Sequence, residues 1–385
     1  MDGFRADYLD RAPLPFFKRL LTEGAYSRRF HPVFPSITFP SHCSEATGVS
    51  AGRHGVTGNG FYDTTTRAAY RFPADASLLQ AEPIWLTAKR QGVRDLVFDW
   101  PLSQKEVNPL HADYFNDKFD NNVTDDQRLD HLLETWHADS TGGGEPLRLL
   151  MGYVEGTDPT GHRYGPDAPE IVDELKKLDG SLGTFFDRVV AQWKEHAAPA
   201  DRLYVMFTTD HGMSAVQKSV SLEKILDLVH GQTEVTIQTT GNTGNIFLDK
   251  TPAGPAREAQ AKAFLDKLKP YPFIQAWRQA DLPAKWGYAN PTRTGDIVVV
   301  VPKGYTLASG PQAVSEGGPK GMHGYPVEDD PEMYGVTFVW RSMPGLGGKD
   351  LGEVNWDQYH PTVAKWLGIQ PAAEAKGQPL ALPGE

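Results

Sequence analysis

Short runs of apolar residues alternate along the chain with longer segments in which apolar residues recur every three or four positions. The runs are rich in branched and aromatic residues, which predicts strands near 95–100, 147–156, 202–210 and 296–302. The longer segments predict helices near 78–91, 125–137, 168–194 and 356–367. Strands that alternate with helices are typical of an α/β protein whose central sheet is mostly parallel and flanked by helices.

The segment 168–194 has the clearest helical pattern. Its apolar residues are spaced so that they share one face of a helix: Ile171, Leu175, Leu178, Leu182 and Phe186. We therefore expect a long amphipathic helix that covers one face of the sheet.

The character of the sequence changes between residues 215 and 318. This part suggests a pair of strands near 234–248, a helix rich in Ala and Lys at 255–268, and a strand at 296–301. We interpret 215–318 as a small inserted α+β cap. Residues 1–214 and 319–385 would then form the catalytic core.

Composition narrows the classes of protein that fit. The chain has 385 residues, of which 39% are hydrophobic, enough for one elaborated domain or one domain with a cap. Asp and Glu outnumber Lys and Arg by 49 to 38, which disfavours binding of a nucleic-acid polymer but not of a small phosphate ester. The single cysteine, Cys43, excludes an internal disulfide. The sequence contains no run of 18 apolar residues, so it predicts no membrane span. The oligomeric state stays open.

Seven side chains that can bind metal ions lie at or near the expected ends of strands. They are Asp2, Thr38, Asp158, His162, Asp210, His211 and His323. Three carboxylates, three imidazoles and one hydroxyl are too many for one tetrahedral zinc ion, so we expect two ions. A pair of ions about 3.5–4 Å apart suits in-line displacement at phosphorus. The mixed Asp and His donors favour Zn²⁺, although Mn²⁺ or Fe also fit.

The local sequence around these ligands supports this interpretation. Asp210 and His211 follow the run RLYVMFTT, so they belong at the carboxyl end of a buried strand, where open α/β sheets bind ligands. Asp158 and His162 are four apart, but Pro159 and Gly161 disfavour a helix, and we expect a loop there. A single Asp or His is more often a capping or core residue. Three such groups at strand ends favour a metal site.

Three further residues are candidates for catalysis or substrate binding. Thr38 precedes a probable helix with Pro40 in its first turn, where the helix dipole and free amides would stabilise an alkoxide and a phosphoryl oxygen. The alternative is a helix-capping threonine. Asn59, between two glycines, is either a phosphoryl-binding amide or a turn residue. Phe39 is either a core residue or a stacking surface for a leaving group.

Eight motifs together resemble one known family. In chain order they are DGFR, VFPSITFPSH, GNGFYD, EPIW, DWP, EGTDPTGHRYGP, TTDHGM and GMHGY. This set resembles the nucleotide pyrophosphatase/phosphodiesterase family of the alkaline phosphatase superfamily over nearly the whole chain. The resemblance implies an alkaline-phosphatase-like α/β core and a dizinc phosphodiesterase. It also implies a covalent threonyl-phosphate intermediate and a small phosphodiester or nucleotide substrate.

The resemblance also implies a role for each candidate residue. Thr38 would be the nucleophile and Asn59 the amide that binds the phosphoryl group. One zinc would be held by Asp2, Thr38, Asp210 and His211, and the other by Asp158, His162 and His323. Phe39 would help form the leaving-group pocket, and Phe119 falls where many members have a tyrosine that stacks on a nucleobase.

The start of the chain departs from the family pattern. Asp2 should follow a strand, but no strand precedes it and no export signal is present. Our hypothesis is that Met1 is an internal methionine of a longer gene product and that the first core strand lies upstream. The full-length form would then be periplasmic or secreted.

Three other functions stay open on the sequence alone. The same metals and nucleophile would suit a phospholipase C-like enzyme that cleaves phospholipid or choline-type diesters. A phosphomonoesterase would normally require a cationic side chain near the phosphate. A metal-stabilised binding protein without activity is disfavoured because the ligand set is complete.

Overall fold

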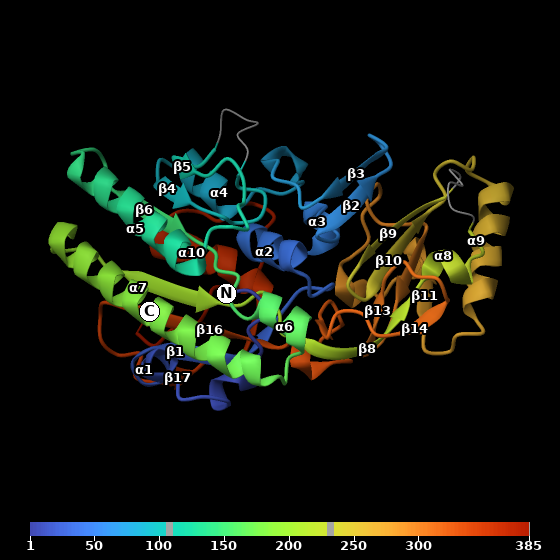
Figure 1. Cartoon of the computed structure of the whole chain (residues 1–385). Helices are drawn as coiled ribbons and strands as arrows, with labels where there is room; N and C mark the ends of the chain where they lie inside the picture. Colours follow the sequence, from blue (N-terminus) through green and yellow to red (C-terminus); the bar gives the residue numbers. More distant parts are fainter. Residues whose placement is uncertain (105–110, 229–234, 385) are drawn as a thin grey trace.

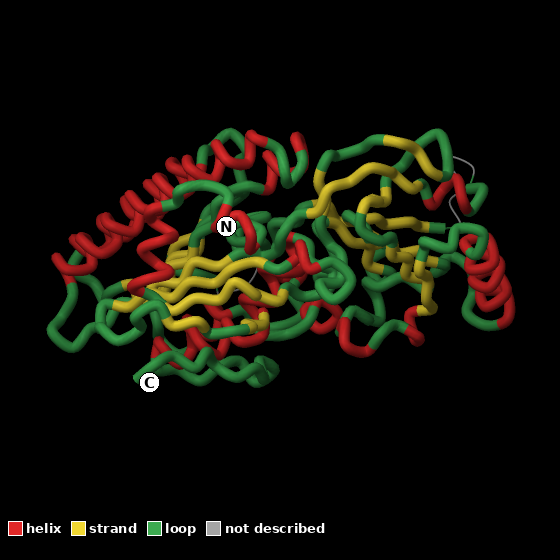
Figure 2. Tube along the Cα trace, turned by 90° about the horizontal axis from the view of Figure 1, so that it is seen from below, coloured by secondary structure: helices red, strands yellow, loops and turns green. Residues whose placement is uncertain are grey.

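The centre of the molecule is formed by two neighbouring groups of strands with helices on both sides (Figures 1 and 2). The computed structural model describes residues 1–104, 111–228 and 235–384. The first group has the order β17-β1-β16-β7, with β18 also paired to β1, and the second has the order β5-β4-β6. Their bounds are β1 Ala25–His31, β16 Gly335–Arg341, β7 Tyr204–Thr208, β17 Lys349–Asp350, β18 Glu353–Asn355, β4 Arg94–Val97, β5 Tyr114–Phe115 and β6 Leu147–Met151. Strand β16 runs antiparallel to β1 and β7, whereas β4 runs parallel to β5 and β6.

Strand β16 shows why both faces of the sheet are covered. Neighbouring residues of a strand point to opposite faces. Phe338 packs in a buried cluster with residues of α1 (Pro15–Glu23) and α7 (Pro169–His196), and Val339 packs in another cluster with Tyr359 of α10 (Tyr359–Leu367). A strand that is apolar on both faces needs a helical layer on each side. The predicted α/β class is therefore confirmed.

The expected helices are present. They are α4 Ile84–Arg90, α5 Asp125–Thr141, α7 Pro169–His196 and α10 Tyr359–Leu367, whereas α1 was not predicted from the sequence. All five apolar residues that predicted the long helix are buried on one face of α7, so that prediction is confirmed. Figure 1 shows α5 and α7 side by side, and the two helices are in contact. No helix in the described part of the chain is long and apolar enough to cross a membrane.

The remaining strands and α9 lie at one end of the molecule, on the right of Figure 1. The expected strand pair and helix are β9 Thr236–Thr240, β10 Thr243–Phe247 and α9 Pro255–Leu268; residue 234 lies outside the described part. The other elements are β8 Ser214–Val220, α8 Leu222–Ile225, β11 Gln275–Arg278, β12 Ile297–Val300, β13 Gly304–Leu307 and β14 Val314–Glu316. Strand β10 pairs antiparallel with β9 and β12. The division into a core and a cap at 215–318 stays a prediction.

One local prediction was wrong. Residues Asp158–Tyr164 form a short helix, α6, and not a loop. Pro159 lies in the first turn, where a missing N–H costs nothing because that amide has no partner within a helix. Gly161 is tolerated because it lies against the side chain of Met213, and a Cβ there would be 3.0 Å from the Met213 methyl carbon. Close packing therefore outweighed the weak helix propensity of this segment.

We expect acid to lower the free energy of unfolding through the buried residue His54, at the end of α3 (Ala51–His54). Its Nδ1 accepts a hydrogen bond from the Val56 N–H, and its Nε2 lies 2.9 Å from the Ser44 hydroxyl, so the ring is fixed in a neutral form. Burial lowers the pKa of His54 to about 3. The unfolded chain, with a histidine pKa of about 6.5, binds this proton first as the pH falls. Stability should therefore be lost progressively as the pH falls from about 6.5 towards 3.

Urea unfolding of the parent and of His54→Gln near neutral pH and near pH 5 would test this. The variant keeps a donor and an acceptor but cannot titrate. We expect its loss of stability between the two pH values to be smaller than that of the parent by up to roughly 2 kcal/mol. An equal loss in both proteins would contradict the assignment.

Candidate active site

The predicted metal ligands, from five segments of the chain, meet at one end of the central strands. Asp210 and His211 come just after β7, separated from it by Thr209, and α6 carries Asp158 and His162. His323 follows β15 (Gly321–Met322), which pairs with β8. Asp2 is placed by its backbone, because the Met1 amino group donates to the Thr208 carbonyl at 2.9 Å and the Asp2 N–H donates to the Val154 carbonyl at 3.1 Å.

One set of ligands surrounds His211. Its Nε2 lies 3.0 Å from a carboxylate oxygen of Asp210 and 3.3 Å from one of Asp2. The hydroxyl of Thr38 lies 3.3 Å from the same nitrogen. All four side chains are buried. The first predicted ligand set is therefore brought together around one point.

The second set surrounds Asp158. One oxygen of this carboxylate lies 3.3 Å from Nε2 of His162 and 3.5 Å from Nε2 of His323. The two nitrogens are 3.2 Å apart. The rings of His211 and His323 stack with centroids 3.6 Å apart, which places the two sets side by side. Potential ligand atoms of Asp2, Asp158 and His211 also lie within 4.8 Å of one another, so Asp158 faces both sets.

All three histidines present Nε2 to the centre because their other ring nitrogen is held by the backbone. The Nδ1 atoms lie 2.8 Å from the Gly212 carbonyl in His211, 2.8 Å from the Gly321 carbonyl in His162 and 3.0 Å from the Ser36 carbonyl in His323. A carbonyl can only accept, so each Nδ1 carries the hydrogen. The neutral imidazole then has its lone pair on Nε2, which is the usual arrangement of a metal-binding histidine.

The carboxylates of Asp2, Asp158 and Asp210 favour the binding of positive charge between the two ligand sets. Asp2, Asp158 and Asp210 each have one buried oxygen without a hydrogen-bond partner among the described residues. Burial, with Asp210 and Asp158 nearby, raises the pKa of Asp2 well above its usual value. Burial lowers the pKa of His162, but the neighbouring Asp158 outweighs it and raises this pKa to about 9. Carboxylates that draw protons onto adjacent imidazoles would also draw divalent cations, so the residues fit metal ions.

Thr38 is the first residue of α2 (Thr38–Thr47), with Pro40 in the first turn as predicted. The residue at the capping position is Ile37, and it makes no side-chain cap. The hydroxyl of Thr38 instead faces His211, so the alternative of a capping threonine was wrong. Its position at the start of a ten-residue helix adds the favourable field of the helix dipole.

Asn59 lies beside the start of the same helix. Its Oδ1 accepts a hydrogen bond of 2.9 Å from the Phe39 N–H. Because a backbone N–H can only donate, this contact fixes the side-chain orientation and leaves the amide NH₂ to point elsewhere. Asn59 can therefore offer a donor close to Thr38.

Two aromatic surfaces lie near these residues. Phe39 packs edge-to-face on Phe72, with ring centroids 5.7 Å apart, and Phe72 is 56% exposed. Phe119 lies edge-on to Tyr153 at 5.7 Å, and the Arg128 guanidinium lies over the Phe119 ring at 4.0 Å. Phe119 is thus held near the metal-ligand cluster, because Tyr153 also donates to a carboxylate oxygen of Asp2 at 2.5 Å, and Phe39 directly follows Thr38 in the chain.

Sequence reasoning missed Tyr153, Phe72 and His42. Tyr153 holds Asp2, Phe72 extends the Phe39 surface, and Nδ1 of His42 lies 3.5 Å from Asp210 and 2.8 Å from the Thr38 carbonyl. His42 lies four residues after Thr38, one turn further along α2. This spacing of four residues was the signal from which His42 could have been predicted to lie near Thr38. Nothing in the local sequence distinguished Tyr153 or Phe72.

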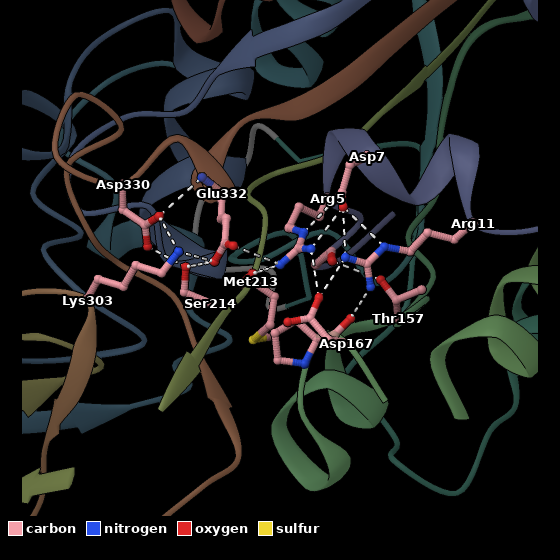
Figure 3. Close-up of polar contacts among 12 residues, drawn as sticks. Arg5, Asp7, Arg11, Thr157, Asp167, Met213, Ser214, Lys303, Asp330 and Glu332 are labelled. Carbon is pink, nitrogen blue, oxygen red and sulfur yellow. Dashed lines mark hydrogen bonds and ion pairs between the residues drawn. The ribbon is translucent and has the colours of Figure 1, made fainter. Parts of the chain in front are cut away.

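Figure 3 shows the polar network that supports the ligand-bearing segments. Arg5, which is buried, donates to the Met213 carbonyl at 3.2 Å and pairs with Asp7 and Asp167. It also lies 3.5 Å from Glu332, whose other oxygen is 2.6 Å from the Lys303 ammonium. The network therefore connects the segment that follows Asp2 to the segment that follows His211. It also connects both segments to Lys303, which lies between β12 and β13.

The fold and the cluster together define a metal-dependent hydrolase of the α/β class. Residues 1–326 match the family described as type I phosphodiesterase / nucleotide pyrophosphatase. The chain therefore belongs to this family. It is accordingly a hydrolase of phosphodiester or pyrophosphate bonds, as the resemblance implied.

Curated relatives match most of the chain. A bis(5'-adenosyl)-triphosphatase enpp4 of Xenopus laevis is 29% identical over 331 residues, which are 84% of this chain and 67% of the relative. The human bis(5'-adenosyl)-triphosphatase ENPP4 is 26% identical over 383 residues, covering 96% and 77%.

Solved structures share the fold. Human ectonucleotide pyrophosphatase / phosphodiesterase 5 has a TM-score of 0.83 at 22% identity, with 96% of this chain and 94% of that chain covered. The murine protein, described as an inactive threonine-to-alanine variant in complex with AMP, has the same score and identity, with coverage of 99% and 96%. The predicted alkaline-phosphatase-like fold is thereby confirmed.

Proposed function

We propose that this protein is a nucleotide pyrophosphatase/phosphodiesterase that works through a covalent threonyl-phosphate on Thr38 at a two-zinc site. The observation that carries the proposal is the position of the Thr38 hydroxyl. It is buried at the start of α2 and faces His211 at 3.3 Å, beside three carboxylates and two further imidazoles. A hydroxyl placed in this way is an activated nucleophile.

The metal sites follow the predicted ligand sets. Asp2, Thr38, Asp210 and His211 would hold one Zn²⁺, and Asp158, His162 and His323 the other. When bound, two such ions polarise the phosphoryl group and favour ionisation of the nucleophile. The close approach of Asp158 to Asp2 and His211 would keep the two sites adjacent.

The reaction would proceed in two displacements. The Thr38 oxygen forms a bond to phosphorus, the bond to the leaving-group oxygen breaks, and that oxygen leaves with its electron pair and takes up a proton. A water oxygen then bonds to phosphorus, the bond from phosphorus to the Thr38 oxygen breaks, and a proton from this water restores the Thr38 hydroxyl. The free NH₂ of Asn59 would donate to a nonbridging phosphoryl oxygen, where negative charge accumulates in the transition state.

The aromatic surfaces favour a nucleotide as substrate. Phe39 with Phe72 offers one apolar wall beside the nucleophile, and Phe119 offers a second ring that a base can stack on. The frog relative is named for hydrolysis of a dinucleoside triphosphate, and the murine structure is described with AMP. A choline-type or lipid diester would use the same chemistry with a different pocket. A periplasmic or secreted location stays a prediction.

The reaction class is tested by comparing two chromogenic substrates. We expect bis-p-nitrophenyl phosphate to be hydrolysed with a kcat/KM at least about tenfold higher than p-nitrophenyl phosphate. The pocket has to accept two substituents on phosphorus, and the Arg128 guanidinium near Phe119 pairs with Asp99 and so is not available for a dianion. A preference for the monoester would contradict the substrate class while leaving the nucleophile untested.

Asn59 should contribute through its NH₂ donor. We expect Asn59→Asp to lower kcat by about 10²- to 10³-fold, the loss typical for removal of one oxyanion donor, with little change in stability. The aspartate keeps an oxygen that can accept from the Phe39 N–H, so the start of α2 stays anchored. Asn59→Ala removes both contacts and is the comparison. If the aspartate variant kept full activity, the anchoring of Phe39 would be the only role of Asn59.

A further inference from the structure

Phe119 lies in a segment without regular structure, between β5 and α5. A side chain in such a segment keeps one position only where other residues anchor it. The Phe119 ring is partly exposed and meets Tyr153 edge-on, and the Arg128 guanidinium lies 4.0 Å from its centroid. Because this cation covers one face of the ring, a flat group can stack only on the other face.

Arg128 is well placed to hold this ring. It is 4% exposed, its Nη1 lies 3.0 Å from a carboxylate oxygen of Asp99, and its Nη2 donates to the Asp120 carbonyl at 2.7 Å. The guanidinium is therefore fixed by a carboxylate on one side and by the chain next to Phe119 on another. Its planar shape suits an aromatic face better than the ammonium of lysine would.

The stability of α5 does not explain why an arginine is buried here. Arg128 directly follows the capping box of Thr124 and Gln127 at the start of the helix. At this end the helix dipole favours anions, and Asp125 and Asp126 provide them. A buried ion pair adds little net stability compared with apolar packing. Placement of the Phe119 ring gives Arg128 a role that helix stability does not.

Asp99, in the DWP motif, anchors the other end of the same segment. Its N–H donates to Oδ1 of Asn116 at 2.8 Å, and the Asn116 amide donates back to the Asp99 carboxylate. Asn116 lies three residues before Phe119, and Asp120 directly follows it. The Asp99–Arg128 ion pair therefore holds the Phe119 segment at both ends.

The DWP motif also relates the ring to the nucleophile. The Trp100 indole N–H donates to the His42 carbonyl in α2 at 3.1 Å. Thr38 is the first residue of this helix. The nucleophile and the Phe119 ring thus belong to one connected framework, so a substrate that reaches both is bound in a defined orientation.

We propose that Arg128 and Asp99 are positioning residues that hold Phe119 as one wall of a nucleobase subsite. They would thereby determine how strongly the enzyme prefers diesters that carry a base. The inference rests on the proposed function, because it assigns the ring to a nucleotide substrate. A ring that is ordered beforehand does not lose conformational freedom when the base stacks on it, and such stacking strengthens binding by about tenfold.

The test compares two diesters with the same leaving group. The p-nitrophenyl ester of thymidine 5'-monophosphate carries a base, and methyl p-nitrophenyl phosphate does not. We expect Arg128→Met to lower the ratio of their kcat/KM values about five- to tenfold, mainly through a higher KM for the nucleotide ester. Arg128→Lys keeps a charge beside Asp99 but loses the planar group, so its ratio should lie between those of the parent and Arg128→Met.

Further variants separate positioning from a general loss of structure. Arg341→Met removes another buried guanidinium, which donates to the Pro383 carbonyl at 2.8 Å, and should leave the ratio unchanged. Phe119→Leu should lower the ratio by itself, and Arg128→Met added to it should cause little further change. If Arg128→Met unfolds because Asp99 is left unpaired, the double variant with Asp99→Asn removes both charges.

Binding of AMP in the presence of Zn²⁺ gives a readout that does not depend on turnover. We expect Arg128→Met to raise the Kd of AMP about five- to tenfold and that of inorganic phosphate less than about twofold. The inference is overturned if both ligands or both diesters are affected equally, if neither is affected, or if the effects of Arg128 and Phe119 add. A parent protein that binds AMP but hydrolyses neither diester would instead contradict the proposed function.

Discussion

Replacing Thr38 by alanine is expected to lower diester hydrolysis by more than about a thousandfold. The hydroxyl of Thr38 lies 3.3 Å from Nε2 of His211, and α2 begins without a side-chain cap, so the loss of this hydroxyl should not disturb the start of the helix. Zinc bound by Asp158, His162 and His323 keeps all its protein ligands. Steady-state rates, metal content and Tm measured on the same samples would separate a loss of chemistry from a loss of structure.

Two variants serve as controls for this experiment. Thr38→Ser retains a hydroxyl and should keep partial activity. Thr47→Ala removes a buried hydroxyl at the other end of α2, where it donates to the Cys43 carbonyl, and should leave kcat within about twofold. Normal turnover of Thr38→Ala would exclude the covalent mechanism and would favour direct attack by water.

The parts of the fold that were predicted correctly depend on strong local patterns. The apolar face of α7 repeats over many turns, and the α9 region has the bounds that its composition suggested. The candidate ligands could be identified because strands of an α/β protein end at a common edge. Asp210 and His211 come just after the apolar run that forms β7, so their meeting with Asp158 could be expected from the sequence.

The parts that were missed depend on contacts between distant segments. The helix α6 forms although it contains Pro159 and Gly161, because it packs against Met213, about fifty residues away. The Tyr153 hydroxyl reaches Asp2 across 151 positions of sequence, and Phe72 meets Phe39 only after the chain turns back. The carbonyls that orient the three histidines likewise belong to the folded backbone, which a residue pattern does not specify.

Removal of bound metal should abolish diester hydrolysis and destabilise the fold. Three carboxylates lie in the cluster, and each has a buried oxygen without a hydrogen-bond partner among the described residues. Cations present at about a thousand times their Kd would stabilise the folded state by about 4 kcal/mol, which corresponds to a Tm change of about 5 °C for a chain of this length. We therefore expect chelation to lower Tm by that amount and activity to background, and Zn²⁺ to restore both.

A variant of His323 tests whether this effect arises at the proposed site. His323→Ala removes one of the three ligands of the second proposed site, so it should lose most activity at limiting zinc and regain part of it at excess zinc. His131→Ala is the matched control, because His131 stacks on Phe98 away from the cluster and its loss should leave zinc dependence unchanged. Equal zinc affinity in both variants would place the ions elsewhere. A drop confined to His323→Ala would show that zinc is bound through this histidine, since the two substitutions remove the same side chain and differ only in where it lies.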